Sequence, residues 1–266
     1  MDWGLQNRMN RILKPATGRT VMLAVDHGYF LGPTSGLEQL DRTVAPLLDY
    51  ADSLMLTRGA LRNCVSPTTE VPIMLRVTGG TSIVSNDQET SSLSNENLAV
   101  SMEDALRLNV SGVAVSVFIG TEDERQTLEN LTDMIDEGEQ FGVPVLAVTA
   151  VGRDMVRDLR YLGLCTRICA ELGAHIVKTY YCEGFDKLVA ATPVPVVIAG
   201  GKKIPEKNAL QLAHDAISAG AAGVDMGRNI FQSKAPEAMI RAVRGIVHDG
   251  LDVKEAWTLV EPELAR

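Results

Sequence analysis

The chain has 266 residues, of which 45% are hydrophobic and 22% are charged, a balance typical of a globular protein with a large buried core. A formal net charge of −9 leaves no broad basic field, which argues against a nucleic-acid partner. No basic segment followed by an apolar stretch opens the sequence, and no run of about eighteen apolar residues occurs, so we expect a cytoplasmic protein with no membrane partner.

Short apolar runs rich in Val, Ile, Leu and Met recur along the whole chain. They are too uniformly apolar to alternate with polar residues, which is typical of parallel strands buried on both faces. In chain order these predicted strands are residues 21–25, 53–56, 73–77, 113–117, 145–148, 176–178, 196–199 and 224–226.

Segments with helical spacing separate most of these runs. Several of these predicted helices end at a Gly or Pro just before the next strand. The clearest predicted helices are residues 122–140, 157–172, 205–219 and 236–248. An unbroken series of strand–helix units predicts one (β/α)₈ TIM barrel domain over residues 1–266, with an open doubly wound sheet as the structural alternative. The polar, Ser-rich stretch 79–95 is predicted to be a long loop and is a candidate lid.

Active sites of such barrels lie where the strands end, and Lys178 is the most informative residue at such a position. A buried lysine loses its ammonium form more easily, and the resulting amine can attack a carbonyl carbon. The alternative from the residues alone is a lysine neutralised by a neighbouring aspartate at the barrel end.

Two glycine turns, Gly200-Gly201 and Gly227-Arg228, follow the last two predicted strands. Barrels commonly bind a phosphate group there, because glycines let backbone N–H groups approach its oxygens and an arginine can clamp it. Ordinary tight turns that need Gly for positive φ are the alternative.

Three further residues are candidates at the same end of the barrel. Asp26 follows the first strand, where it could orient Lys178 or move protons, although it could equally cap the next turn. His27 and Tyr180 are candidate substrate contacts, against a purely structural role.

The cysteines and histidines do not suggest a metal site. Cys64, Cys165, Cys169 and Cys182 form no C-x-x-C pair, and the four histidines form no H-x-x-x-H pair. We interpret the cysteines as reduced structural thiols, and only Cys182 lies near Lys178 in sequence.

Four segments resemble the site segments of the archaeal-type class I fructose-bisphosphate aldolases, a superfamily of Schiff-base-forming barrels, and the likeness covers nearly the whole chain. The segments are Val25-Asp26-His27-Gly28, Val177-Lys178-Thr179-Tyr180, Val197-Ile198-Ala199-Gly200-Gly201 and Gly227-Arg228-Asn229-Ile230-Phe231-Gln232. The resemblance implies that Lys178 is the Schiff-base lysine, Asp26 the site aspartate, and the glycine turns with Arg228 the phosphate cradle. It also implies a homo-oligomer, a decamer built from stacked rings of five subunits.

Other segments are similar to one branch of that superfamily, the thiolases that act on 3-hydroxy-5-phosphonooxypentane-2,4-dione, a form of phosphorylated autoinducer-2. These segments are Asp2-Trp3-Gly4, Asp26-His27-Gly28-Tyr29-Phe30, Thr57-Arg58-Gly59, Lys178-Thr179-Tyr180-Tyr181 and Gly200-Gly201-Lys202-Lys203. One departure from the aldolases matters: their acid–base tyrosine after the fifth strand is replaced here by Ala150. Because retro-aldol cleavage needs a base for a hydroxyl group, this replacement favours thiolysis.

The branch implies that Lys178 forms an imine with a phosphorylated ketone and that coenzyme A, a co-substrate and not a tightly bound cofactor, attacks the neighbouring acetyl group. The products would be acetyl-CoA and dihydroxyacetone phosphate. A class I fructose-bisphosphate aldolase, an aldehyde-lyase, is the first alternative. A non-covalent sugar-phosphate isomerase or epimerase, and a phosphosugar-sensing protein without turnover, are the others.

Overall fold

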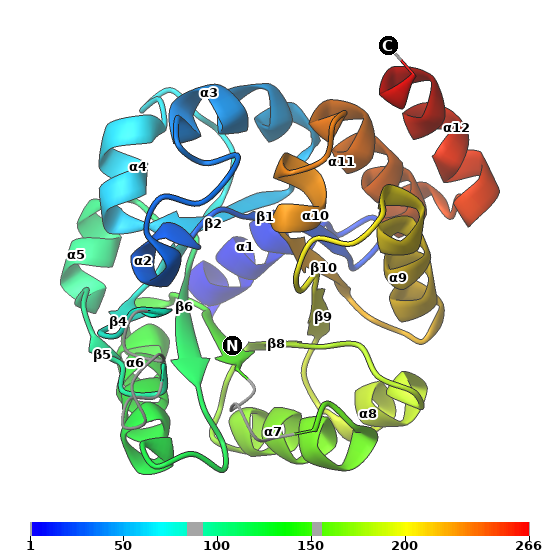
Figure 1. Ribbon diagram of the computed structural model, residues 1–266. Coiled ribbons are helices and arrows are strands. Elements are labelled where there is room, and N and C mark those ends of the chain that lie inside the picture. The colour runs from blue at the N-terminus through cyan, green and yellow to red at the C-terminus, as the bar shows by residue number, and fades with distance from the viewer. Residues whose placement is uncertain (1, 84–92, 151–155, 266) are drawn as a thin grey trace.

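The computed structural model describes residues 2–83, 93–150 and 156–265, and within them eight parallel strands close into one barrel (Figure 1). Around the barrel the strands are hydrogen-bonded in the order β1-β10-β9-β8-β7-β6-β3-β2. This closure confirms the predicted TIM barrel and excludes the open sheet. The strands are β1 (Thr20–Ala24), β2 (Ser53–Thr57), β3 (Ile73–Arg76), β6 (Gly112–Val117), β7 (Val145–Thr149), β8 (Ile176–Thr179), β9 (Val196–Ala199) and β10 (Gly223–Met226).

All eight predicted strands are present, and no predicted strand end differs from the observed one by more than one residue. A short antiparallel ribbon, β4 (Thr78–Gly79) with β5 (Asn97–Leu98), was not predicted and extends from the end of β3. It flanks the stretch 79–95, the candidate lid, and residues 84–92 of that stretch lie outside the described residues.

Helices surround the strands, as Figure 1 shows. The four predicted helices correspond to α6 (Glu124–Phe141), α7 (Leu159–Glu171), α9 (Glu206–Ser218) and α11 (Pro236–Arg244), the last continued by a π-helical turn at Gly245–Asp249. The others are α1 (Trp3–Ile12), α2 (Gly28–Leu31), α3 (Leu40–Val44) with a 3₁₀ turn at Ala45–Tyr50, α4 (Arg58–Cys64), α5 (Met102–Arg107), α8 (Phe185–Ala191), α10 (Arg228–Phe231) and α12 (Val253–Leu264). Within the described part of the chain, no helix combines the length and apolarity needed to cross a membrane.

Side chains of each strand alternate between two apolar cores. On β8, Val177 packs in the layer between strands and helices, whereas Ile176 packs inside the barrel. The same alternation puts Met22, Met55 and Met74 inside. Because the side-chain period of a strand is two residues, a residue two positions after an interior one also points inward. Lys178, two positions after Ile176, is therefore directed into the barrel near the strand ends.

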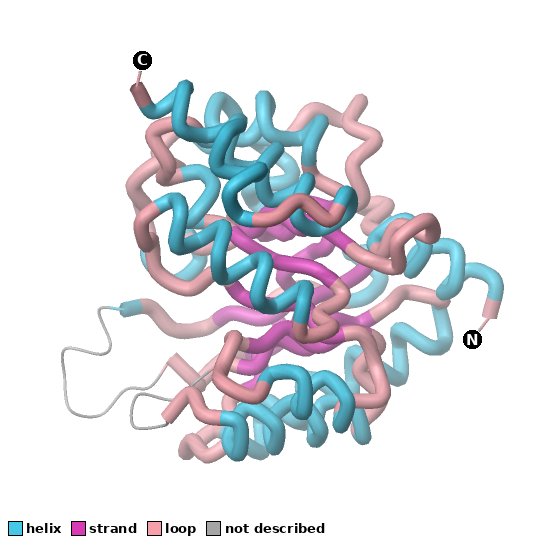
Figure 2. Tube along the Cα trace, turned by 90° about the vertical axis from the view of Figure 1, so that its right-hand side faces the viewer, coloured by secondary structure: helices cyan, strands magenta, loops and turns pink. Residues whose placement is uncertain are grey.

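Helix α1 covers the end of the barrel where the strands begin. It lies behind the strands in Figure 1, and Figure 2 shows the N-terminus at one end of the barrel. Met9 and Ile12 of this helix join the interior core. With this end closed by apolar side chains, the opposite end is the one available for a site.

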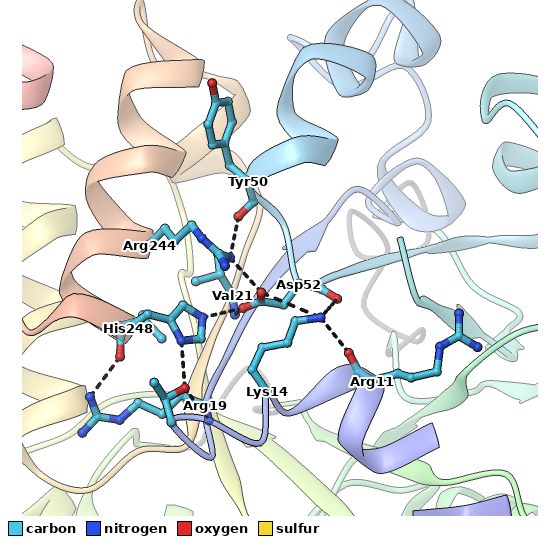
Figure 3. Close-up of polar contacts among 10 residues, drawn as sticks. Arg11, Lys14, Arg19, Val21, Tyr50, Asp52, Arg244 and His248 are labelled. Atoms are coloured by element: carbon cyan, nitrogen blue, oxygen red, sulfur yellow. Dashed lines mark hydrogen bonds and ion pairs between the residues drawn. The ribbon is translucent and has the colours of Figure 1, made fainter. Parts of the chain in front are cut away.

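A polar cluster around Asp52, which we call the basal cluster, secures the same closed end (Figure 3). The Val21 N–H donates to Asp52 Oδ2 at 2.7 Å, Arg244 Nη1 donates to Oδ1 at 2.7 Å, and His248 Nε2 lies 2.6 Å from Oδ2. Lys14 Nζ lies 4.0 Å from Oδ1. One buried carboxylate thus connects β1, β2, the segment after α1 and the C-terminal helices.

Candidate active site

A cavity of about 210 Å³ opens at the carboxyl ends of the strands. Its lining includes all eight residues that the sequence predicts for the site: Lys178, Asp26, Gly200, Gly201, Gly227, Arg228, His27 and Tyr180. These residues lie at the ends of four strands, β1, β8, β9 and β10, and closure of the barrel brings them together.

Lys178 is only 8% exposed, yet it lines the cavity, and its Nζ lies 2.8 Å from Oδ2 of Asp225 on β10. Asp225 is 1% exposed, and this burial raises the pKa of its carboxyl group above the ordinary value. The aspartate partner that the sequence left as an alternative to a reactive lysine therefore exists, but the pair borders the cavity.

Asp225 was not singled out from the sequence. The signal was present in Val224-Asp225-Met226, where a charged residue stands between two apolar residues of a buried strand. Val224 and Met226 pack in the outer core, so the alternation of the strand turns Asp225 inward.

Asp26, 6% exposed, accepts a hydrogen bond from Arg76 Nε at 3.0 Å, and Arg76 Nη1 donates to Ser116 Oγ at 2.9 Å. Burial alone would raise the pKa of Asp26, but the positive charges of Arg76 and its neighbours outweigh burial and hold that pKa below the ordinary value. Among the described residues, Asp225 and not Asp26 is the carboxylate within ion-pair distance of Lys178. Asp26 is therefore a fixed negative charge at the edge of the site.

His27 is a neutral imidazole at neutral pH. Burial, with added repulsion from nearby cations including Arg228, lowers the pKa of His27 to about 4 despite the attraction of Asp26. Its ring makes an edge contact with Phe231, with the ring centroids 5.6 Å apart. The side chain lines the cavity without supplying a charge.

The two glycine turns form one wall of the cavity with Arg228. Asn229 connects them, because its Nδ2 donates to the Gly200 carbonyl at 2.6 Å while its Oδ1 accepts from the Ile204 N–H at 2.9 Å. Gly227 has no room for a side chain, since a Cβ there would lie 2.2 Å from the Ala24 carbonyl oxygen. Nε of Arg228 is buried and has no hydrogen-bond partner among the described residues.

The opposite wall carries two residues to which the sequence had assigned no role. Tyr29 in α2 donates a hydrogen bond from its hydroxyl to Glu96 Oε1 at 2.8 Å, and the same hydroxyl lies 3.5 Å from Ser116 Oγ. Glu96 precedes β5 and is 2% exposed. No sequence pattern could have found Glu96, because it stands in a polar segment that resembles an ordinary loop.

The remaining candidates divide between the cavity and its surroundings. The ring of Tyr180 lines the cavity and stacks under the Arg157 guanidinium, whose Cζ lies 3.7 Å from the ring centroid. Ala150 also lines the cavity and offers no titratable group. Cys182 is buried in the outer core, where burial raises the pKa of its thiol, and all four cysteines are free.

Comparisons with known proteins agree with this geometry. Residues 20–233 match the model of the DeoC/LacD family of aldolases. A 3-hydroxy-5-phosphonooxypentane-2,4-dione thiolase of Photorhabdus laumondii is 55% identical over 260 residues, which make up 97% of this chain and 87% of that protein. An uncharacterised aldolase of Pasteurella multocida is also 55% identical, over 97% of this chain and 88% of that protein. Among solved structures, an archaeal fructose 1,6-bisphosphate aldolase superposes with a TM-score of 0.80 at 25% identity, covering 92% of this chain and 100% of that chain.

Proposed function

The chain belongs to the DeoC/LacD aldolase family, and from this premise we propose that it is a Schiff-base-forming thiolase. Its substrates are 3-hydroxy-5-phosphonooxypentane-2,4-dione and coenzyme A, and its products are dihydroxyacetone phosphate and acetyl-CoA. The observation that carries the proposal is the buried amine of Lys178, which lines the cavity 2.8 Å from a carboxylate oxygen of Asp225.

Lys178 attacks the C4 ketone of the dione. The nucleophile must be the neutral amine, and a buried carboxylate with a raised pKa is suited to take up the ammonium proton. Asp225 then returns a proton to the carbinolamine oxygen, which leaves as water. The fixed negative charge of Asp26 stabilises the resulting iminium cation.

The phosphate group binds at the wall formed by the two glycine turns and Arg228. The Nε of Arg228 has no hydrogen-bond partner among the described residues, so its N–H is available to donate to a bound phosphate. Helix α10 has only four residues, so the cradle depends on backbone N–H groups and on the guanidinium more than on a helix dipole.

With the iminium as electron acceptor, the coenzyme A thiolate attacks the C2 carbonyl carbon, the C2–C3 bond breaks, and acetyl-CoA leaves. The C3 enamine is protonated and the imine is hydrolysed, which releases dihydroxyacetone phosphate and regenerates Lys178. Ala150, at the cavity wall, favours this reaction over aldol cleavage, because it cannot deprotonate a substrate hydroxyl group. A class I fructose-bisphosphate aldolase is the second candidate, supported by the likeness to the archaeal aldolase structure.

Borohydride reduction in the presence of dihydroxyacetone phosphate tests the imine. We expect a covalent adduct on the Lys178 peptide in mass spectrometry, no adduct in Lys178→Met, and a normal adduct in Lys187→Met, a matched change at an exposed lysine of α8. An unmodified wild-type peptide would exclude the Schiff base and favour an isomerase or epimerase. Product formation with and without coenzyme A then separates a thiolase, which needs it, from an aldolase, which does not.

A further inference from the structure

Glu96 is a buried carboxylate with one unsatisfied oxygen that borders the cavity. Oε1 accepts the hydrogen bond from Tyr29 at 2.8 Å, whereas Oε2 is buried and has no hydrogen-bond partner in the part of the chain that the structure describes. Leaving a buried polar atom unpaired destabilises the folded state, and native proteins seldom tolerate it without a functional reason. A ligand atom in the cavity is therefore the natural partner of Oε2.

The position of Glu96 is fixed by its backbone. Asn130 Nδ2 donates to the Glu96 carbonyl at 2.8 Å, and the adjacent β4–β5 ribbon pairs Gly79 with Asn97. Gly80 packs directly against this segment, since a Cβ there would lie 2.7 Å from the Asn95 carbonyl oxygen. The carboxylate is thus held in one place before any ligand binds.

Of the Tyr29–Glu96 pair, only the carboxylate can act as a base. Burial, together with the negative charge of Glu96, raises the pKa of the Tyr29 phenol well above its ordinary value in spite of Arg76, so the phenol keeps its proton and acts as a donor. Tyr29 occupies Oε1 and leaves Oε2 free to accept a proton.

The barrel order places Glu96 at the end of the cavity away from the phosphate cradle. The cradle belongs to β9 and β10, and the strands opposite these two in the closed order are β3 and β6. The β4–β5 ribbon extends from β3, and Tyr29 links Glu96 to Ser116 on β6. A substrate with its phosphate in the cradle and its ketone at Lys178 directs its acetyl end toward Glu96.

Resting on the function proposed above, we propose that Glu96 is the general base of thiolysis and acts at the acetyl end of the substrate, not at the position of Ala150. Oε2 removes the proton from the coenzyme A thiol as the sulfur attacks C2, forming the S–C2 bond. Collapse of the tetrahedral alkoxide breaks the C2–C3 bond, and its electron pair becomes the enamine of the Lys178 iminium. Protonated Glu96 then delivers the same proton to C3, so the carboxylate is regenerated and no net proton is exchanged.

Protonation at C3 is reversible, so the reverse step, removal of a C3 proton from the product imine, can be measured without coenzyme A. Wild-type protein incubated with dihydroxyacetone phosphate in D₂O should exchange a hydroxymethyl hydrogen for deuterium, followed by NMR. In Glu96→Gln, whose amide oxygen can still accept from Tyr29, we expect exchange to be slower by about 10²- to 10⁴-fold while borohydride trapping at Lys178 stays at the wild-type level. Glu103→Gln, an exposed change in α5, should match wild type in both measurements.

The outcomes separate this inference from the proposed function. Unchanged exchange in Glu96→Gln, with trapping intact, overturns the role of Glu96 and leaves the Schiff-base thiolase standing. Loss of trapping in Glu96→Gln also overturns it, because Glu96 would then act before proton transfer. Absence of trapping in the wild-type protein overturns the proposed function itself.

The acidity of the thiol gives a second, independent measurement. A thiol that is already ionised at the assay pH does not need a base. In a single turnover, formation of the acetyl thioester precedes protonation of C3. The wild-type to Glu96→Gln rate ratio of this first step should therefore be large for an alkyl thiol such as coenzyme A and fall toward one for an acidic aryl thiol. A ratio that is the same for both thiols overturns the assignment.

Discussion

Lys178 on β8 reaches past β9 to Asp225 on β10, and its Nζ lies 2.8 Å from the carboxylate oxygen Oδ2. Lys178 is 8% exposed and Asp225 is 1% exposed, so water solvates neither charge well and each charge is stabilised by the other. A buried ion pair of this kind is costly when only one partner is removed.

We expect Lys178→Met and Asp225→Asn to couple strongly in their effects on stability. Each single change leaves one buried charge without its counter-charge, whereas the double change removes both charges, so the double variant should be more stable than the sum of the singles predicts by about 1–3 kcal/mol. Denaturant unfolding of the four proteins measures the coupling. Additive single effects would show that the pair does not interact in solution.

Asp225→Asn should also slow imine formation. The amide cannot take up the ammonium proton of Lys178, so we expect the rate of borohydride-trappable adduct formation to fall by about 10²- to 10⁴-fold. Rapid-quench trapping with dihydroxyacetone phosphate measures this rate. A wild-type rate in Asp225→Asn would show that Asp225 does not transfer this proton and would assign the step to Asp26.

Arg228→Gln should weaken recognition of the phosphate group specifically. Loss of a charged, partly buried phosphate contact costs about 2–4 kcal/mol, which lowers kcat/KM by about 30- to 1000-fold. Steady-state assays with the phosphorylated dione and with its dephosphorylated analogue distinguish a local from a general effect. An equal loss with both substrates would mean that Arg228 does not contact the phosphate.

The two cradle glycines should respond differently to a methyl group. Gly227→Ala places Cβ 2.2 Å from the Ala24 carbonyl oxygen and 2.6 Å from Cε1 of His27, so we expect marked destabilisation and loss of activity. At Gly201 no atom lies within 4 Å of a Cβ, and only its φ of +70° opposes the change, so Gly201→Ala should cost about 1 kcal/mol. Thermal unfolding and kcat/KM of both variants test whether Gly227→Ala has the larger effect. Equal effects of the two changes would contradict this prediction.

His27 should titrate far below an ordinary histidine. Its folded pKa of about 4 is lower than the unfolded value, so the unfolded chain binds the proton first. The stabilising contribution of neutral His27 is therefore complete above the ordinary pKa and is lost as pH falls from about 6.5 toward 4. NMR titration of the imidazole measures the pKa, and His214, which is less buried, provides an internal comparison. A midpoint for His27 near 6.5 would contradict the burial argument.

Asp52→Asn should reduce stability by about 1–3 kcal/mol at neutral pH, because it leaves Arg244, whose side chain is 36% exposed, without its buried counter-charge. Burial opposes ionisation of Asp52, but hydrogen bonds from His248, Arg244 and the Val21 N–H prevail and lower its pKa. Its contribution is thus complete above the unfolded pKa of about 4 and disappears as pH falls through the lower folded pKa.

Denaturant unfolding at several pH values tests the basal cluster. The wild-type advantage over Asp52→Asn should shrink below about pH 4, while Asp49→Asn, an exposed neighbour, should behave as wild type throughout. Asp52 lies at the closed end of the barrel, so the imine trapped at Lys178 should be unaffected in molecules that remain folded. A pH-independent difference between wild type and Asp52→Asn would exclude the carboxylate as its source.

The eight strands were predictable because each is a local apolar run, and a strand buried on both faces needs nothing beyond that run. The gathering of the candidate site residues around one cavity was predictable for a related reason: in a parallel barrel every strand ends at the same face, so a polar residue at a strand end must lie there. Lys178 and Arg228 follow from this rule without knowledge of any contact.

The partners of those residues could not be predicted in the same way. Which carboxylate meets Lys178 depends on the closed strand order, which sets Asp225 two strands away although 47 residues separate the two in sequence. Glu96 reaches the cavity only because the β4–β5 ribbon folds back over the end of β3, and Met9 and Ile12 close the opposite end only because α1 packs there. The sequence by itself determined the elements and the face that carries the candidate site, since both follow from local periodicity. The pairing of charges was decided by the tertiary structure alone, since it depends on distances that exist only once the barrel closes.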